Sequence, residues 1–386
     1  MITVKIMLET ELKKMWRDLF QDEWEYIEWY FEKIYKKKTT RVQLENEKPI
    51  GMLFQNSYHL SIDRDRFLGR YLVGIGVAPE KRGEGVMKSL LIQTLKEAYE
   101  YGEEFLYLTP IDKNIYERFG FGFISKLSKY ELPFSKLESM KKEFRVQKIS
   151  EENYNENLLI QLKDFYREVS KDFYISVARE KEDYKEILSE IFVEEGNVYL
   201  SYDISGKING YMSMIRTENV FIKELLFKEK DALETLLAVV YGYKDYASKV
   251  EIVLPENTYL EDYFKSENGI TKTLKNKVQA RILRVEKTLH RLSKELFENE
   301  EVFIYIQDDY ISENTGVYKL TKDGVEKTKG DFDISLVIKD LATLAYGFRD
   351  FNSLKKIESF YIKNKDKEKM LSRIFKERVN YFNQDF

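Results

Sequence analysis

Hydrophobic and polar positions along residues 9–132 change from a helical period to the shorter period of strands. Residues 9–36 carry apolar side chains three or four positions apart, which predicts one long amphipathic helix. A second helical pattern runs from Met87 to Ala98. Short apolar or alternating runs predict the strands of one sheet: 41–45, 50–54, 57–63, 71–77, 105–109 and a closing strand at 129–132.

The remaining sequence predicts two further units. The strand–helix–strand order of 221–254 repeats that of 71–109, which indicates a second copy of the first unit. The predicted helices are 154–171, 180–194, 231–243, 286–296, 339–346 and 365–378, and the predicted strands are 197–202, 208–215, 221–227, 250–254, 302–307, 316–320 and 333–338. Because 386 residues exceed one ordinary core, we predict three domains of mixed α/β (α+β) architecture, at 1–142, 143–279 and 280–386.

The segment that joins the strand 71–77 to the helix after it carries candidate chemistry. It reads Val77-Ala78-Pro79-Glu80-Lys81-Arg82-Gly83-Glu84-Gly85-Val86-Met87. Two glycines allow backbone N–H groups to turn inward, and the helix that follows points its positive end at the same place. Such a loop binds an anion, most often a phosphate. Neither the dinucleotide-binding fingerprint nor the P-loop lysine pattern is present.

Composition narrows the class of protein. The net charge of −4 argues against a nucleic-acid partner, and no apolar run reaches the length of a membrane span. The absence of cysteine fits a reducing interior, so we predict a cytoplasmic protein without a leader segment. The two histidines, His59 and His290, are too few for a histidine-rich metal site, and we predict no metal. Either could act as a base, although a structural or surface role is the simpler interpretation.

Three features together resemble a known family. Arg82-x-x-Gly85 after Val77-x-Pro79 resembles the acetyl-CoA pyrophosphate loop of the GNAT acyltransferases, although Met87 stands where that family usually has Gly or Ala. Ile115-Tyr116-Glu117-Arg118-Phe119-Gly120 follows the second strand, and the chain ends in Asp385-Phe386. The combination resembles the Eis (enhanced intracellular survival) family of GNAT N-acetyltransferases. That family has two GNAT domains and a C-terminal domain similar to sterol carrier proteins, and it forms hexamers.

The resemblance implies acetyl-CoA as co-substrate, Tyr116 as general acid and the α-carboxylate of Phe386 as general base. It also implies a second GNAT-like domain without a cofactor loop, since Lys228-Glu229-Lys230 stands where the first has its glycines. A backbone N–H of the strand 75–77, with Val77 as candidate, would polarise the thioester carbonyl. The expected cofactor-binding residues are Ile75, Gly76, Val77, Arg82, Gly83, Glu84, Gly85, Val86, Met87, Lys88, Ile111 and Asp112.

The expected acceptor is a primary amine of a polycationic small molecule, similar to an aminoglycoside or a polyamine, or of lysine. Asp22 and Glu25 with Trp24 or Trp29 could form an anionic and aromatic wall for an ammonium group, or could simply be a solvated helix face. Asp385 adjoins the expected base and is the stronger candidate. A different class also stays open, a non-catalytic assembly protein that senses CoA or carries an apolar ligand. The Met87 departure favours that alternative slightly.

Overall fold

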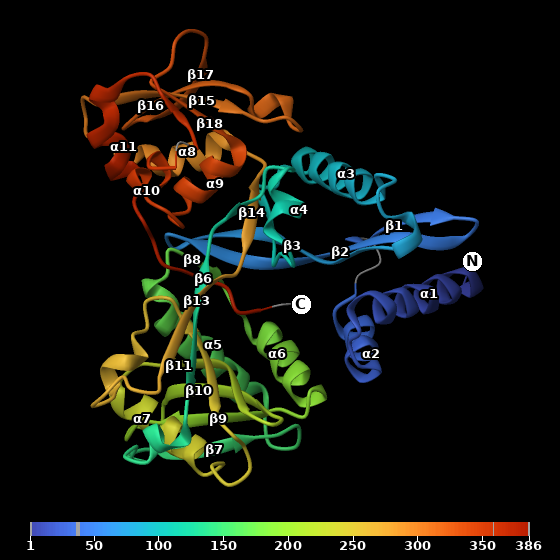
Figure 1. Ribbon diagram of the computed structural model, residues 1–386, viewed down its shortest axis with the longest axis vertical. Coiled ribbons are helices and arrows are strands. Elements are labelled where there is room, and N and C mark those ends of the chain that lie inside the picture. Colours follow the sequence, from blue (N-terminus) through green and yellow to red (C-terminus); the bar gives the residue numbers. More distant parts are fainter. Residues whose placement is uncertain (1, 36–38, 358, 385–386) are drawn as a thin grey trace.

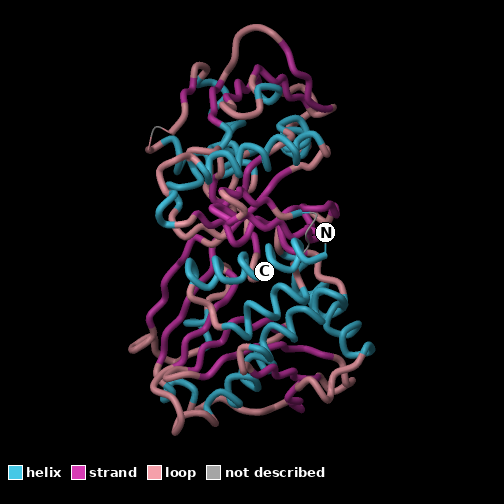
Figure 2. Tube along the Cα trace, turned by 90° about the vertical axis from the view of Figure 1, so that its right-hand side faces the viewer, coloured by secondary structure: helices cyan, strands magenta, loops and turns pink. Residues whose placement is uncertain are grey.

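A computed structural model describes residues 2–35, 39–357 and 359–384 (Figure 1). Three sheets are stacked along the long axis of the molecule, and Figure 2 shows strands and helices alternating in that direction. The first sheet lies in the middle, the third at one end and the second at the other. Within the described residues, no helix combines the length and the apolar character that crossing a bilayer requires.

The first sheet is built mainly from the N-terminal third of the chain. Its elements are α1 (Ile2–Phe20), α2 (Trp24–Lys33), β1 (Arg41–Glu45), β2 (Lys48–Ile62), β3 (Asp65–Val77), α3 (Val86–Glu100), β4 (Phe105–Leu108), α4 (Lys113–Glu117) and β5 (Gly122–Phe123). The single helix expected over 9–36 is therefore wrong. The chain breaks at Gln21, whose φ of 60° lies in the left-handed region and cannot continue a helix. The runs 50–54 and 57–63 are parts of one strand, β2.

The second sheet has the strand order β13-β6-β12-β11-β10-β9-β7. Its elements are β6 (Lys126–Leu132), β7 (Arg145–Ile149), α5 (Glu156–Val169), β8 (Ile175–Val177, which joins the first sheet), α6 (Lys181–Val193), β9 (Asn197–Tyr202), β10 (Ile208–Arg216), β11 (Val220–Phe227), α7 (Lys230–Tyr241), β12 (Val250–Pro255) and β13 (Thr271–Asn276). As in the first sheet, an antiparallel pair leads through a helix to a parallel strand, here β10–β11–α7–β12. The second sheet thus repeats the arrangement of the first.

The third sheet has the order β17-β16-β15-β18-β19 and packs on helices. Its elements are α8 (Val285–Ser293), β15 (Glu301–Gln307), β16 (Gly316–Thr321), β17 (Gly324–Thr328), β18 (Ile334–Val337), α9 (Ile338–Ala345), α10 (Phe351–Lys355), β19 (Tyr361–Ile362) and α11 (Glu368–Ile374). The helix expected over 365–378 is shorter than predicted. A 3-10 turn occupies Lys365–Lys367, and α11 ends at Ile374.

Strand pairing crosses the predicted domain boundaries. β6, expected to close the first sheet, instead lies between β12 and β13 in the second. Its place in the first sheet is taken by β14 (Gln279–Ile282), which pairs with β4 and β5 although it was expected to open the third domain. The sequence could not decide this, because alternation shows which side chains of a strand are buried and does not identify the neighbouring strand.

The C-terminal segment returns to the first sheet. Strand β20 (Asn380–Tyr381) pairs in parallel with β8, which itself pairs with β2. The Asn380 side chain donates to the carbonyls of Ile124 and Tyr346, both at 2.6 Å, and accepts the N–H of Ile175 at 3.0 Å. One buried amide thus binds backbone groups from all three predicted domains. The predicted catalytic end, Asp385 and Phe386, lies outside the described residues.

A buried ion pair joins the first sheet to the third domain. Arg281 of β14 donates to Asp308 at 2.5 Å and to the carbonyl of Phe119 at 2.7 Å, and the side chains of the pair have no exposed surface. Asp308 also accepts the backbone N–H groups of Tyr310 and Ile311, both at 3.1 Å. The pair therefore fixes the loop that carries Tyr310 against the segment that ends at Phe119.

Replacing Asp308 with Asn should destabilise the protein strongly. The amide can still accept the two backbone hydrogen bonds, but Arg281 is left as an uncompensated buried charge, a defect that costs about 3 kcal/mol or more. Urea denaturation measures the change in the free energy of unfolding. Glu301→Gln is the control, because it removes the half-exposed pair with Lys319 (2.9 Å) and should cost less than about 1 kcal/mol. Equal losses in both variants would contradict the structural role of the buried pair.

Candidate active site

A cavity of about 700 Å³ lies where the first sheet, the predicted anion loop and the third domain meet. The end of β3, the start of α3 and the helix α4 form most of its wall, α1 contributes its last residues, and the third domain contributes one tyrosine. The lining residues are Leu19, Phe20, Ile75, Gly76, Val77, Lys81, Arg82, Gly83, Gly85, Val86, Met87, Lys88, Ile111, Ile115, Tyr116, Arg118, Phe119 and Tyr310. Of the twelve residues expected to bind cofactor, all but Glu84 and Asp112 are among them.

The loop before α3 has the geometry of an anion site. Gly83 and Gly85 have φ values of 87° and 84°, in the left-handed region that favours glycine. No atom lies within 4 Å of the position that a Cβ would take at either residue, so this space is open to a ligand. Gly85 precedes the first turn of α3, which has no side-chain cap and no acidic residue. Free first-turn N–H groups, with Arg82 and Lys88 on the same wall, suit a diphosphate group.

β3 and β4 diverge beside this loop. Only Arg70 and Tyr71 of β3 pair with β4, so among the described residues no strand pairs with that side of β3 from Leu72 onward. A bulge at Gly74, whose φ is 57°, shifts the register against β2. The N–H of Ala78 donates to Ile50 of β2, and because bonded and non-bonded pairs alternate in antiparallel strands, the N–H of Val77 points to the open side.

Tyr116 lies at the other end of this gap, on the short helix α4. Asp112 caps that helix by accepting the N–H of Asn114 at 2.9 Å. The Tyr116 side chain is nearly buried, and burial raises the pKa of its phenol to about 12, so the group keeps its proton at neutral pH. Its carbonyl accepts the N–H groups of Phe119 and Phe121, which closes the turn after α4. Tyr116 therefore contributes a phenol to the cavity wall that is protonated at neutral pH and can donate a proton.

Gly120 allows this turn to approach Arg281. Its φ is 85°, and a Cβ there would lie 2.8 Å from the Nε atom of Arg281 and 2.6 Å from Ile338. The ring of Phe119 packs against Tyr310 with centroids 5.5 Å apart. The third domain thus completes the wall beside Tyr116 through the Arg281–Asp308 pair.

Two residues expected to bind cofactor have other roles in the structure. Glu84 is exposed and lies 3.6 Å from Lys81, and the carboxylate of Asp112 caps α4. Both flank the cavity without lining it. The two histidines are exposed and lie outside its wall.

The described residues expected to bind the acceptor, Asp22, Trp24, Glu25 and Trp29, do not line the cavity either. The carboxylate of Asp22 accepts the indole N–H of Trp16 at 2.7 Å, which commits it to the junction of α1 and α2. Trp29 is buried, and its indole donates to Ser189 at 2.7 Å. Glu25 and Trp24 are exposed on α2. Thus, of the proposed pair of tryptophans, only Trp24 presents a ring to solvent.

Sequence reasoning missed several residues of the wall. Leu19 and Phe20 lie at the end of α1, which was treated as the middle of a longer helix. Ile115, Arg118 and Phe119 belong to the segment already singled out around Tyr116, so they could have been predicted. Tyr310 could not, because no local pattern indicates that a loop of the third domain reaches the first sheet.

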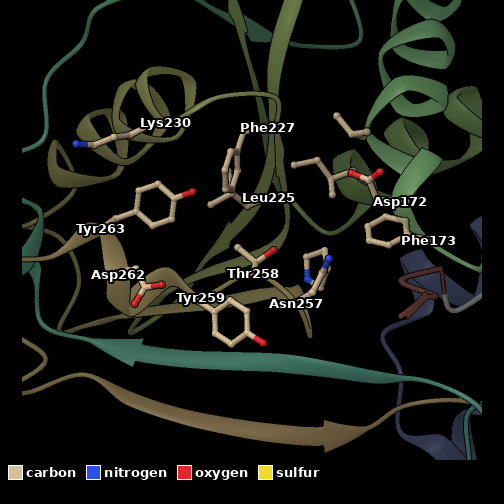
Figure 3. Close-up of a pocket in the computed structure, with 13 residues that line it drawn as sticks. Asp172, Phe173, Leu225, Phe227, Lys230, Asn257, Thr258, Tyr259, Asp262 and Tyr263 are labelled. Carbon is tan, nitrogen blue, oxygen red and sulfur yellow. The ribbon is translucent and has the colours of Figure 1, made fainter. Parts of the chain in front are cut away.

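A cavity of about 450 Å³ occupies the corresponding place in the second sheet, between the ends of β11 and β12 (Figure 3). These strands pair only from Val220 to Ile222 before they diverge. Figure 3 shows Lys230 at the start of α7, with Phe227, Tyr259 and Tyr263 around the space. Glu229 occupies the N-cap position of α7, where the first domain has Gly85, but its side chain makes no capping hydrogen bond, and Asp231 lies in the first turn. This charge disfavours a phosphate group.

The comparisons with known proteins agree with this geometry. Residues 4–124 match the family model of the acetyltransferase (GNAT) domain, and residues 285–383 match that of the sterol carrier protein domain. The chain thus combines a GNAT acetyltransferase domain with a sterol-carrier-like domain, and the predicted GNAT domain and mixed α/β fold class are confirmed. No protein with curated function matches the sequence significantly.

Solved structures share the fold over nearly the whole chain. A probable N-acyltransferase of unknown function from Enterococcus faecalis is 18% identical over 97% of both chains, with a TM-score of 0.81. A GCN5-related N-acetyltransferase from Anabaena variabilis is 19% identical over 98% of this chain and 97% of its own, also at 0.81. Eis1 from Mycobacterium abscessus is 16% identical over 92% of both chains, at 0.74. The predicted Eis-like layout is therefore confirmed.

Gly85→Asp should weaken CoA binding by at least about 100-fold, because it places a carboxylate against the phosphate site and contact between like charges costs several kcal/mol. Isothermal titration with CoA measures the affinity. Gly206→Asp is a matched control: Gly206 has a φ of 80°, also with open space around it, but lies in the second domain. Unchanged CoA affinity in the Gly85 variant would contradict the placement of the phosphate loop.

Proposed function

We propose that this protein transfers an acetyl group from acetyl-CoA to a primary amine, with Tyr116 as the general acid. The observation that carries the proposal is that the anion loop at 82–88 and the phenol of Tyr116 line one cavity, with the open edge of β3 between them. The acetyltransferase family match at 4–124 supports the same activity. Acetyl-CoA enters as a substrate, and the residues of the cavity fit its diphosphate group.

Acetyl-CoA, the acetyl donor, binds along the open edge of β3. The first-turn amides of α3 with Arg82 and Lys88 hold the diphosphate, and the extended arm of CoA pairs with the free edge of β3 as an added strand. The N–H of Val77, which faces this gap, polarises the thioester carbonyl as the amine attacks it. A tetrahedral centre forms, the C–S bond breaks, and Tyr116 gives its proton to the departing sulfur.

The raised pKa of Tyr116 makes the phenol a weaker acid than a free tyrosine. The departing thiolate develops in the same buried place, and burial raises the proton affinity of a thiolate as well. The difference between the two groups is therefore smaller than the value of about 12 alone suggests.

We assign the general base to the α-carboxylate of Phe386, following the family resemblance. A free carboxyl of pKa about 3.5 cannot usefully deprotonate an ammonium of pKa about 10.4, so the group has to be buried. The buried tail supports this assignment: Tyr381 stacks on Phe173, and Phe382 packs against Tyr107 of β4, with ring centroids 4.9 and 5.5 Å apart. Burial continues to Gln384, the last described residue.

The proposed acceptor is a polycationic small molecule, similar to an aminoglycoside or a polyamine, or a lysine side chain. Asp385 is the proposed contact to its ammonium groups, because it adjoins the base. Glu25 and Trp24 are exposed on α2 and can add a further anionic and aromatic contact. Asp22 and Trp29 would act on the acceptor only indirectly, through the α1–α2 junction and the packing of α2.

A thiol-release assay with acetyl-CoA and a panel of amines tests the activity. CoA binding without turnover of any amine would instead support the non-catalytic CoA-sensing or carrier protein. The cytoplasmic location and the hexamer follow from composition and family resemblance. Light scattering that gave any mass other than that of six subunits would contradict the hexamer.

Tyr116→Phe should lower kcat by a factor of about 10²–10⁴, the usual contribution of a positioned general acid, while CoA affinity stays near that of the wild type. Steady-state kinetics and titration calorimetry measure the two quantities. Tyr310→Phe removes a hydroxyl from the same cavity wall and should leave kcat almost unchanged.

The pH profile gives a second check on Tyr116. A pKa raised to about 12 keeps the Tyr116 phenol protonated until the pH exceeds about 11. Deprotonation of this phenol should therefore cause no fall in rate between about pH 7 and 10. An alkaline decrease near pH 10 that disappears in Tyr116→Phe would show that the phenol titrates at its ordinary value.

Extending the chain by two glycines beyond Phe386 should abolish turnover and preserve CoA affinity. The extension converts the α-carboxylate into an amide, which cannot accept the proton of the ammonium group. The same two glycines added at the N-terminus serve as the control. Normal acetylation by the C-terminally extended protein would show that the base lies elsewhere.

A further inference from the structure

A second cavity, of about 560 Å³, lies where the β2–β3 turn of the first sheet meets α5 and β8. Six of its thirteen lining residues are cations, and Glu180 is the one carboxylate in its wall: the cations are Arg64, Arg66, Lys163, Arg167, Lys171 and Arg179. The protein as a whole carries a net charge of −4. The wall of this cavity is therefore strongly positive, although the chain as a whole is slightly acidic.

Neighbouring carboxylates neutralise only part of this charge. Glu180 pairs with Arg66 at 2.7 Å, and Asp164 lies 3.1 Å from Arg167 and 3.9 Å from Lys163. Asp172, next to Lys171, lines the other cavity, which is shown in Figure 3. Within the described part of the chain, neither Arg64 nor Lys171 forms an ion pair. Arg64 and Lys171 can therefore each bind a ligand without breaking an ion pair, although Lys171 also feels the more distant carboxylate of Glu168.

Arg179 forms the buried part of the cavity wall. Its two Nη atoms hold the carboxylate of Glu224 at 2.8 and 2.9 Å, and its guanidinium stacks 4.4 Å from the ring of Tyr166. Only 4% of Arg179 is exposed, and its Nε–H is buried with no hydrogen-bond partner among the described residues. Because the Nε atom has almost no accessible surface, the buried Arg179–Glu224 pair shapes the wall and leaves anion binding to the exposed cations.

Hydrogen bonds within the protein fix the wall of this cavity. Tyr381 donates to Glu224 at 2.6 Å and so fixes the partner of Arg179. On the opposite side, Asp63 and Arg64 have φ values of 49° and 73°, the left-handed pair of a tight hairpin turn where asparagine and glycine are preferred. The N–H of Asp63 donates to the carbonyl of Tyr174 at 2.8 Å, which holds this turn against the second domain.

We propose that this cavity binds a small, multiply charged anion of the phosphate type, held by the exposed side chains of Arg64 and Lys171. The serine hydroxyls of the wall, Ser61, Ser170 and Ser176, add further donors. The site is separate from the loop at 82–88 and does not depend on acetyl transfer.

Inorganic pyrophosphate is the probe, and isothermal titration is carried out on the full-length protein saturated with CoA, so that the loop at 82–88 is occupied. The wild type should bind one pyrophosphate under these conditions. Arg64→Ala combined with Lys171→Ala should weaken that binding at least tenfold, because both free charges are removed and both side chains are exposed enough to be changed without disturbing the fold.

Lys141→Ala combined with Lys142→Ala is the control, since it removes the same charge from exposed positions outside the cavity and should leave the affinity unchanged. Absence of pyrophosphate binding to the CoA-saturated wild type would overturn the proposal. Equal weakening by the two double variants would also overturn it, because the anion would then respond only to net charge. Acetylation kinetics play no part in this readout, so the site can fail while the proposed activity stands.

Discussion

The ion pair of Arg281 and Asp308 is the constraint on which the candidate active site depends. Both side chains are fully buried, so each charge is tolerable only while the other stays in place. Arg281 holds the carbonyl of Phe119, three residues after Tyr116, and Asp308 holds the backbone of the loop that presents Tyr310. A strand from late in the chain, β14, thereby fixes the segment that follows Tyr116 against a loop of the third domain.

Buried polar interactions also hold the C-terminal segment in place. Asn380 satisfies backbone groups from three predicted domains with one buried amide, and Tyr381 reaches the carboxylate that holds Arg179. The tail therefore cannot leave the first sheet without exposing several unpaired polar groups. The chain is therefore fixed on the first sheet as far as Gln384, although a chain end usually frays. The same contacts also place the cationic cavity and the C-terminal segment on opposite sides of one ion pair.

Exchange of strands between the first two sheets makes the domains interdependent. β6 leaves the first domain to pair in the second sheet, and β14 crosses back to fill the first. The two sheets share one plan, in which a strand diverges from its parallel neighbour next to a helix N-terminus. Only the first has glycines with positive φ at that helix, while Glu229 and Asp231 bring negative charge to the second. The residues at the start of the helix are thus what distinguishes the cleft of the first sheet from that of the second.

Local sequence determined the anion loop, the position of Tyr116 near it and most of the helices and strands, because glycines, helix starts and apolar periods act over a few residues. Family motifs extended this to the layout of the whole chain. Tertiary structure alone decided that the helix breaks at Gln21, that β6 and β14 exchange sheets, that Trp29 is buried and that Tyr310 completes the cavity. These outcomes depend on contacts between residues far apart in the chain. The periodicity of side chains shows which face of an element is buried, but it does not show which other element packs against that face.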